Sequence, residues 1–376
     1  MRQSARWEVL PFDQVFRDVT AGNARIEQKH YLESGPLPVI DQGQSEIAGY
    51  VDDPSLACRT PLPCLVFGDH TKLVKFVDHP FAIGAQGVRV LVPTEQLDTR
   101  FAYYALRRVP FPSDTGYSRH TRFLKRARIA FPPLTEQRRI ASVLDKADGI
   151  RRKRLESLRL LDEFLRSAFL EMFGDPVRNE KRWEVVALGD LLVRPLRNGL
   201  SPAKGGRIPA RVLTLTAITG SRFEPTAVKM GQFARLAHPD QSAHPNDFLI
   251  CRGNGNVKLM GRARFPRDIR SGTLFPDTMI AARVDPARIQ PAYLEAVWAM
   301  PAVRRGLESG SRTTSGIHKV NQKILTSIRF PLPPLERQQE YASIVDRVER
   351  LREQLSSAAS TELFDSLAQQ AFRGEA

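Results

Sequence analysis

The chain has 376 residues, enough for two ordinary domains, and a hydrophobic content of 42% that is normal for a soluble protein. No apolar run approaches the ~20 residues of a membrane-spanning helix, no apolar signal-peptide core is present, and the three cysteines lack the spacing of a zinc site or a disulfide framework. The net charge of +15 favours a polyanion such as nucleic acid as the partner, although Arg-rich usage across a whole proteome would give the same excess.

Length, composition and cysteine spacing predict a cytoplasmic protein with no membrane partner. The distribution of charge along the chain shows where a polyanion would bind. Residues 174–334 carry 25 Lys and Arg against 12 Asp and Glu, whereas residues 1–133 carry 17 against 14. The segments 134–173 and 335–376 together have a net charge of −1. The basic excess therefore lies in two globular parts, and mainly in the second.

The first globular part, residues 1–133, begins at Trp7-Glu8-Val9-Leu10 and contains short β-type runs broken by turns. Runs at 64–67 and 88–92 predict strands, and 100–108 predicts an amphipathic helix, as in a mixed α+β domain. Gln pairs with adenine, while His and Lys reach phosphate or guanine, so polar loops here are candidate DNA contacts. The alternatives are that Asp69 and His70 only satisfy each other at a turn, and that the later basic segment is a solvated face. The candidates are Gln42, Gln44, His70, Thr71, Lys72, Ser118 and Arg119.

A long helix follows the first globular part. Pro132-Pro133-Leu134-Thr135-Glu136-Gln137 ends a strand-like run and leads into a helix from about Thr135 to Phe173. Its apolar residues recur at spacings of three and four, and Gly174 stands where a helix C-cap is expected. At 1.5 Å per residue, thirty helical residues span about 45 Å, which is too long for a helix that lies on its own small domain.

The second globular part, residues 175–334, repeats this organisation from Trp183-Glu184-Val185-Val186 onwards. Runs at 212–215 and 248–251 predict strands, and 291–306 predicts a helix. After the second strand, glycines alternate with Arg, Asn and Lys, so that backbone could approach a phosphate while side chains reach base edges. A plain hairpin turn is the alternative for this loop, and a flexible surface loop is the alternative for residues 309–319. The candidate DNA contacts are Lys204, Arg207, Arg252, Asn254, Asn256, Lys258, Arg312, Ser315 and Lys319.

Pro333-Pro334-Leu335-Glu336-Arg337-Gln338 repeats the helix start and predicts a second long helix from about Glu336 to Phe372. Two amphipathic helices of this length in one chain are expected to bury their apolar stripes against each other as a coiled coil. Two ordinary core helices are the alternative. The chain is thus divided into residues 1–133, 134–174, 175–334 and 335–376. The residues predicted for helix pairing or partner docking are Leu144, Leu158, Leu165, Val348, Leu351 and Leu355.

The duplicated Pro-Pro-Leu-x-x-Gln start of a long helix resembles the conserved regions of the DNA-specificity subunit of type I restriction–modification systems. Phe67-Gly68-Asp69-His70-Thr71 and the paired helix ends Ser167-Ala168-Phe169 and Gln370-Ala371-Phe372 resemble the same family. Residues 218–229, 252–261 and 314–317 look like signatures of its variable domains. The resemblance covers essentially the whole chain, and the order of these motifs, duplicated at this spacing, is specific.

The resemblance implies an α+β fold in which two mixed α/β target-recognition domains alternate with two long helices that pair as an antiparallel coiled coil. Each domain would read one half of a split, asymmetric site in double-stranded DNA, and the helices would set the gap between the halves. The helices would also dock two copies of a modification methyltransferase subunit, and a restriction/translocase subunit is left open. The chain itself would be non-catalytic and bind no cofactor or metal, because S-adenosylmethionine belongs to the methyltransferase subunit.

Two functions of other classes remain open from the residues alone. A helical scaffold whose globular parts bind proteins would explain the long helices, although it has no need of a strongly basic second part. A metal-dependent nuclease would need clustered carboxylates, and the spacing of Asp247, Asp268 and Asp277 gives it no support. Signatures of methyltransferases, phosphate-binding loops and zinc proteases are absent from the sequence, so we expect no catalysis by this chain alone.

Overall fold

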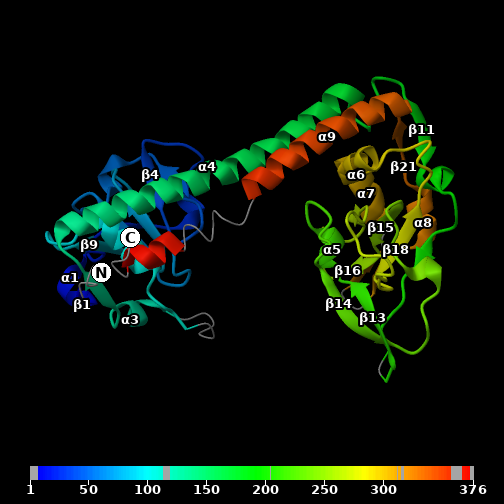
Figure 1. Ribbon diagram of the computed structural model, residues 1–376. Helices are drawn as coiled ribbons and strands as arrows, with labels where there is room; N and C mark the ends of the chain where they lie inside the picture. Colours follow the sequence, from blue (N-terminus) through cyan, green and yellow to red (C-terminus); the bar gives the residue numbers. More distant parts are fainter. Residues whose placement is uncertain are drawn as a thin grey trace. The chain divides into compact units, whose positions relative to one another are not determined.

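Helix α4 (Leu134–Phe173) is one continuous helix of 40 residues, which confirms the long helix predicted from about Thr135 to Phe173. In this computed structural model (Figure 1) the chain divides into two units, and α4 begins in the first and ends in the second. The first unit comprises residues 1–155 and 357–376, and the second comprises residues 156–356. The structure describes residues 7–112, 119–203, 205–310, 312–314, 317–356 and 366–372.

The first unit is built on an antiparallel sheet in which both faces are buried. Its strand order is β2 (Phe16–Asp18), β9 (Val88–Pro93), β6 (Cys64–Gly68) and β7 (Val74–Val77). Because side chains alternate along a strand, Leu65 and Phe67 pack under helix α2, while Cys64 and Val66 fill a separate cluster on the other face. Helix α2 spans Thr99–Arg107. Both strands and the helix predicted for this part of the chain are confirmed.

A second sheet of the first unit has the order β3-β8-β4-β5 and contains two parallel pairs. Strands β1 and β10 form a separate antiparallel pair just before α4 begins, with Glu8 opposite Phe131. The remaining bounds are β1 (Glu8–Pro11), α1 (Phe12–Val15), β3 (Arg25–Ile26), β4 (Leu37–Ile40), β5 (Gly49–Val51), β8 (Ala82–Gly84), α3 (Thr121–Leu124) and β10 (Arg128–Phe131).

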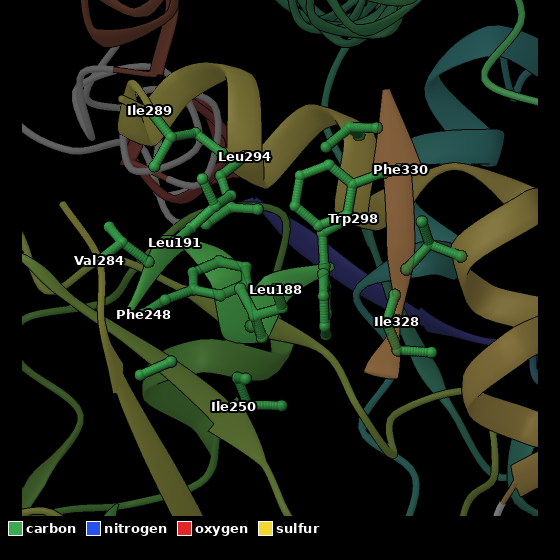
Figure 2. Close-up of a cluster of buried hydrophobic side chains, with 14 of the residues drawn as sticks. Leu188, Leu191, Phe248, Ile250, Val284, Ile289, Leu294, Trp298, Ile328 and Phe330 are labelled. Carbon is green, nitrogen blue, oxygen red and sulfur yellow. The ribbon is translucent and has the colours of Figure 1, made fainter. Parts of the chain in front are cut away.

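The second unit repeats the main sheet with strands of the same order, β12 (Arg197–Asn198), β18 (Met279–Arg283), β15 (Asp247–Cys251) and β17 (Ala263–Arg264). Its core is aromatic and aliphatic, and Figure 2 shows Phe248, Trp298 and Phe330 together in it. The strand predicted at 248–251 is confirmed, whereas the one predicted at 212–215 is β13 (Ile208–Leu213), which ends earlier. Further elements are β11 (Glu184–Ala187), α5 (Thr216–Thr219), β14 (Val228–Phe233), α8 (Gln322–Ser327) and β21 (Arg329–Leu332).

The prediction of a single helix at 291–306 is wrong, because this segment forms two helices. Helix α6 (Pro291–Ala299) ends at Met300, which has an extended ψ of 147°, and α7 (Pro301–Gly310) begins at the next residue. A residue that precedes proline is excluded from the helical region by a clash with the proline ring. Pro301 therefore ends the first helix and starts the second.

One buried glutamine in each unit ties the long helix to its globular part. Gln137 donates from Nε2 to the carbonyls of Pro132 (2.8 Å) and Gln96 (3.1 Å), and its Oε1 accepts from the Asp98 N–H (2.7 Å). The equivalent Gln338 donates to the carbonyls of Pro333 (2.8 Å) and Arg288 (3.2 Å) and accepts from the Gln290 N–H (2.8 Å). This arrangement, which we name the glutamine clamp, joins the helix start to the loop before α2 in the first unit and before α6 in the second.

Helix α9 (Leu335–Ser356) packs antiparallel to the part of α4 that lies in the second unit (Figure 1). Near its start, Tyr341 contacts Phe169 and Phe173, and near its end Arg352 pairs with Asp162 at 2.7 Å. The packed face of α9 consists of Tyr341, Val345, Val348 and Arg352, at spacings of four, three and four. The predicted fold class, with two mixed domains and paired long helices, is confirmed.

Leu351 does not contribute to the pairing of the two helices. It is 50% exposed, because the packed face of α9 passes through its neighbour Arg352. Val348 is buried, and Leu158, Leu165 and Leu355 are half-buried. Leu144 is fully buried, but in the core of the first unit.

The second long helix was predicted to reach Phe372, and the structure describes two parts of that range. Helix α9 is described as far as Ser356, residues 357–365 lie outside the described part, and residues 366–372 are helical. Ala368 and Ala371 of this stretch join the core of the first unit, and the Phe372 ring lies 5.2 Å from that of Phe101. In the second unit the matching residue Phe169 stacks on Tyr293 at 5.7 Å. The duplicated helix ends thus dock at equivalent places.

Removal of the glutamine clamp should cause a large loss of stability. Gln338→Ala should lower the free energy of unfolding by about 3 kcal/mol, because each buried backbone group that loses its partner costs about 1–3 kcal/mol. Its neighbour Gln339 is exposed, so Gln339→Ala should change stability by less than about 0.5 kcal/mol. Urea unfolding followed by circular dichroism measures both. Equal stability of the two variants would contradict a structural role of the clamp.

Candidate nucleic-acid interface

The loop that follows the central strand lies at the same place in both units. In the first unit, Asp69 follows β6, and its carbonyl accepts from the His120 N–H at 2.9 Å. In the second, Arg252 follows β15, and its carbonyl accepts from the Val320 N–H at 2.9 Å. His120 and Val320 each lie just before the short last helix of the unit, α3 or α8. Two loops far apart in sequence therefore meet in each unit, and most of the candidate contacts lie on them.

Two glycines allow the loops of the first unit to pack closely around Gln42. A Cβ on Gly68 would lie 2.9 Å from Gln42 Cβ and still closer to the Thr71 hydroxyl. Gly87 has a φ of +77°, and a Cβ there would lie 2.8 Å from both Gln42 Oε1 and His70 Cδ2. Gln42 Oε1 in turn accepts from the His70 N–H at 3.2 Å. Glycine at both positions is what brings Gln42 and His70 together.

A polar cavity of about 350 Å³ opens beside these loops, and cationic side chains dominate its lining. Arg89 is held by Asp18 at 3.6 Å. Among the described residues, the side chains of Arg25 and Arg119 have neither a hydrogen-bond nor an ion-pair partner, and both are exposed. Two free guanidinium groups next to a histidine and two glutamines can contact phosphates or the acceptor edge of guanine. The lining residues are Arg25, Asp69, His70, Gln86, Gly87, Val88, Arg89 and Arg119.

Asp69 has a structural role, but with a different partner from the one expected. Its carboxylate accepts from the Thr121 N–H and hydroxyl, both at 2.7 Å, and so caps the start of α3. The Asp69 carboxylate is thus bonded to Thr121, whereas His70 was the partner considered from the sequence. The cap holds Arg119 beside the turn that carries His70.

Other candidates of the first unit belong to a second cavity, of about 580 Å³. Gln44 and Lys72 line it, and Lys72 Nζ donates to the Pro112 carbonyl at 3.1 Å. Burial lowers the pKa of the neighbouring Lys75, against the opposite effect of Asp41. The Thr71 hydroxyl accepts weakly from the Leu73 N–H at 3.4 Å. Gln44 and Lys72 thus line a different cavity from His70 and Arg119, whereas Thr71 lies beside Gln42 at Gly68.

In the second unit, two separately predicted loops form one small sheet. Strand β16 (Gly253–Asn254) pairs with β20 (Ile317–Lys319), and β20 pairs with β19 (Arg312–Thr314). The register sets Lys319 opposite both Gly253 and Arg312. We name these three strands with residues 255–258 the basic ribbon.

The asparagines of the basic ribbon shape its turn. Asn254 Oδ1 accepts from the Asn256 N–H (2.9 Å), and Asn256 Oδ1 accepts from the Lys258 N–H (3.0 Å), while neither side-chain nitrogen has a hydrogen-bond partner among the described residues. Arg252 donates to the Asp277 carbonyl at 3.3 Å. Lys258 and Lys319 are exposed. The ribbon can therefore offer two ammonium groups and two amide donors to a polyanion.

Five candidates remain, four in the second unit and one in the first. Each either lies away from the basic ribbon or has a side chain that the structure does not describe. Arg207 is exposed next to the hairpin of β13 and β14, which is a separate sheet. Ser118, Lys204 and Ser315 lie outside the described residues. Arg312 is described only by its backbone, in β19.

Much of the arginine excess in the second unit is structural. Arg304 donates to the Met260 carbonyl (2.6 Å) and Val257 carbonyl (3.2 Å), which supports the turn of the basic ribbon from beneath. Arg262 donates to the carbonyl of Thr219 at the end of α5 (2.6 Å), and Arg264 donates to that of Ser221 (2.8 Å). Guanidinium groups used in this way have fewer N–H donors left for phosphate. The net charge of residues 174–334 therefore overstates the positive surface.

The carboxylates considered for a nuclease do not form a metal site in the described part of the chain. Asp247 is fully buried and bridges Arg197 (2.5 Å) and Arg283 (2.5 Å). No group of three or more His, Cys, Asp or Glu side chains suited to a metal is found among the described residues. Burial raises the pKa of the Cys251 thiol to about 11, so it is not a thiolate nucleophile. No described helix is long and apolar enough to cross a membrane.

Comparison with known proteins agrees with this duplicated arrangement. A family described as the type I restriction modification DNA specificity domain matches residues 6–160 and 309–363, more than half of the chain. The chain belongs to this family. It is 26% identical over 270 residues to the type I restriction enzyme EcoKI specificity subunit of Escherichia coli, and 26% over 272 residues to the StySPI specificity subunit of Salmonella potsdam. Each match covers 66% of this chain and 57% of the relative, so the chain spans little more than half the length of these relatives.

Solved structures of the family share the fold. The S subunit of a type I restriction–modification system from M. genitalium matches with a TM-score of 0.61 at 16% identity, over 99% of this chain and 98% of that one. A chain from a structure that concerns complex assembly of the type I system matches with a TM-score of 0.50 at 17% identity, over the whole length of both. The fold of these structures, with two mixed domains and long helices, thus extends over the entire chain.

Sequence reasoning missed Arg25, Gln86 and Arg89, which line the cavity of the first unit. Gln86 has a φ of 50° and stands before Gly87 in the turn between β8 and β9, and such a turn between two strands was a usable signal. Arg25 lies on β3, a strand of only two residues, which is too short to show the alternation of apolar and polar residues that predicts a strand. Its position follows from parallel pairing with β8, a long-range contact.

The cavity of the first unit predicts which arginines bind DNA. Arg25→Ala and Arg119→Ala should each weaken DNA binding about tenfold, and each should reduce the salt slope of binding by about one, because a phosphate contact is lost. Arg138, exposed on α4 and outside every described cavity lining, serves as the control, and Arg138→Ala should leave affinity and slope unchanged. Fluorescence anisotropy at several salt concentrations measures both quantities. Equal affinities for all three variants would exclude this cavity as a contact site.

Proposed function

We propose that this chain is the DNA sequence-recognition subunit of a type I restriction–modification complex and that it binds a bipartite, asymmetric site through its two units. The observation that carries the proposal is the equivalent position of two polar, cationic loop pairs, one in each unit. The loop after β6 meets the segment before α3, and the loop after β15 meets the segment before α8. The same pair of loops with different side chains in each unit is suited to the recognition of two different half-sites.

The side chains support two kinds of contact. Arg25, Arg119, Lys258 and Lys319 supply positive groups for phosphates or guanine, and these set orientation and affinity. Gln42, with Gln86 and the asparagines of the basic ribbon, supplies amides that suit adenine edges in the major groove. Half-sites one turn of B-DNA apart, about 34 Å, face the same side of the duplex. The sequence read by each unit would then differ because the loop residues differ.

The chain would act without chemistry of its own. Two modification methyltransferase subunits would dock on the long helices and carry S-adenosylmethionine, while a restriction/translocase subunit is a further potential partner. Support for docking comes from apolar side chains that the helices leave exposed. In the second unit these include Leu160 (50% exposed) and Phe164 (52% exposed) on α4. Large apolar residues exposed on a charged helix are typical of protein contacts.

Selection of binding sites tests the proposed recognition. The full chain, purified with its modification subunit, is incubated with random DNA duplexes, and the bound fraction is sequenced. The expected result is two short conserved blocks of different sequence, separated by a gap of constant length. If no sequence is enriched, while the chain still binds its modification subunit, the scaffold alternative is favoured instead.

A single substitution tests the proposed docking surface. Phe164→Ser should reduce co-purification of the modification subunit at least about tenfold, because a contact aromatic that becomes buried is worth more than about 1 kcal/mol. Arg166→Ser, at an exposed polar position of the same helix, is the matched control and should have little effect. Co-purification of Phe164→Ser at the wild-type level would remove this part of α4 from the interface.

A further inference from the structure

Strands β13 and β14, low in the second unit in Figure 1, form a two-stranded sheet with one covered face and one open face. On the covered face, Val212 and Phe233 pack with Leu274 in a small cluster of their own. Side chains of residues opposite each other in an antiparallel pair lie on the same face, and they alternate along each strand. The register therefore places four side chains together on the other face, which we name the open face: Pro209, Arg211, Met230 and Gln232.

The side chains of the open face are available for a ligand. Met230 is 65% exposed, which is high for a large apolar residue within a strand. Gln232 is exposed, and its side-chain amide has no hydrogen-bond partner among the described residues. Arg211 lies opposite Met230, is half-buried, and its Nε is buried without a hydrogen-bond partner. A buried donor that stays unpaired is costly, so a ligand that approaches Arg211 gains by supplying an acceptor.

The charge around the open face is positive. Residues 205–237 contain five Lys and Arg residues, and their single carboxylate is Glu224. Arg222 lies 3.9 Å from Glu349, whereas the other four cations have no acidic partner among the described residues. An exposed apolar residue surrounded by unpaired cations fits a polyanion with apolar groups within reach, and DNA has both properties. The four cations are Arg207, Arg211, Lys229 and Arg235.

One arginine joins this part of the second unit to the basic ribbon. Arg262 donates from Nε to the Lys258 carbonyl of the basic ribbon at 3.3 Å and from its terminal nitrogen to the Thr219 carbonyl at 2.6 Å. Thr219 ends α5, which begins three residues after β13, and Leu213 of β13 shares a buried cluster with Ile218 of α5. Strands β13 and β14 are therefore held to the candidate DNA interface through α5.

We propose that the open face is a second base-reading element of the second unit, which enters the major groove and reads A·T pairs through Gln232 and Met230. The inference rests on the proposed recognition of a bipartite site. The major groove, about 12 Å wide, admits a two-stranded β-ribbon. There a side-chain amide bonds the edge of adenine, an apolar side chain contacts the thymine methyl group, and a guanidinium such as that of Arg211 donates to a phosphate.

The spacing of the two readers sets where their bases lie. Gln232 and Met230 are two residues apart on one strand, which corresponds to about 7 Å. Two base pairs also rise about 7 Å along the duplex. The thymine that Met230 contacts therefore lies within about two base pairs of the adenine that Gln232 bonds.

The alternative occupant of the open face is a protein, because exposed apolar residues also serve protein contacts. The two occupants differ in what a substitution changes. Loss of a base reader relaxes the sequence at particular positions of one half-site and leaves the complex with the modification subunit intact. Loss of a protein contact weakens that complex and leaves the selected sequence unaltered.

The first experiment is the random-duplex selection with the full chain and its modification subunit, with the base preference at each position as the readout. Gln232→Ala should reduce the preference for one A·T pair in one block about tenfold, because an amide pair with adenine is lost. The other block and the gap should stay as in wild type. Val193→Ala changes a residue of the second unit that is 56% exposed outside β13 and β14, and it should leave both blocks unaltered.

The second experiment replaces each thymine of the affected block by deoxyuridine, which lacks only the methyl group. Wild type should lose affinity about fourfold at one position within two base pairs of the adenine identified with Gln232→Ala, since one methyl group is no longer buried. Met230→Ala should bind the thymine duplex about fourfold more weakly than wild type and show no further loss with deoxyuridine there. Fluorescence anisotropy measures these affinities.

The outcomes separate this inference from the proposed function. If wild type selects no bipartite site, the proposed function fails and the inference fails with it. If wild type selects two blocks and Gln232→Ala and Met230→Ala select them with the same strictness, the open face does not read bases although the proposed function stands. Weaker co-purification of the modification subunit with unaltered blocks would assign the face to a protein contact. A relaxed block with Val193→Ala as well would also contradict the assignment.

Discussion

The buried amide of Gln137, with its counterpart Gln338, is the interaction on which the rest of the structure depends. Each glutamine bonds the prolines that end a strand to the loop that begins the helix of the globular part, and so sets the direction in which the long helix leaves. Because the amide is fully buried and uses both its donor and its acceptor, little freedom remains at this joint. A recognition surface can be held at a fixed place only if the joint that carries it is rigid. The duplicated Pro-Pro-Leu-x-x-Gln motif is therefore a structural joint that occurs once in each unit.

The two globular parts share a main sheet and one contact between loops, and they differ in the strands and loops that are added to these. The main sheet has equivalent strand orders in both units, and the loop after its central strand is bonded to the segment before the last short helix in both. The additions differ, since the first unit has the sheet β3-β8-β4-β5 and the second has the hairpin of β13 and β14 with the basic ribbon. Glycines at Gly68 and Gly87 bring polar side chains together in the first unit, while Arg304 supports the turn in the second. The two units thus carry different loops on the same kind of frame.

The sequence was sufficient for the features that depend on local pattern and repetition. Strands such as β6 and β15, the start of both long helices and the family resemblance follow from apolar runs, prolines and duplication. The meeting of residues 252–258 with residues 317–319 could not be predicted, because strand register over sixty residues leaves no local trace. Leu351 was preferred to Arg352 as a packed residue because hydrophobicity alone cannot fix a helical face to within one position. The arginine excess also overestimated the positive surface of the second unit, since a count of charges does not reveal which guanidinium groups are bound to carbonyls.

The most direct measurement of the central claim, that the two units together specify one split DNA site, is single-molecule methylation sequencing of a host with this gene intact and of the same host with the gene deleted. The proposed function predicts that methyladenine is lost at one asymmetric motif of two blocks separated by a constant gap. A methylation pattern that stays unchanged after deletion, in a host whose modification subunit is expressed and active, would contradict the claim and would favour a protein scaffold.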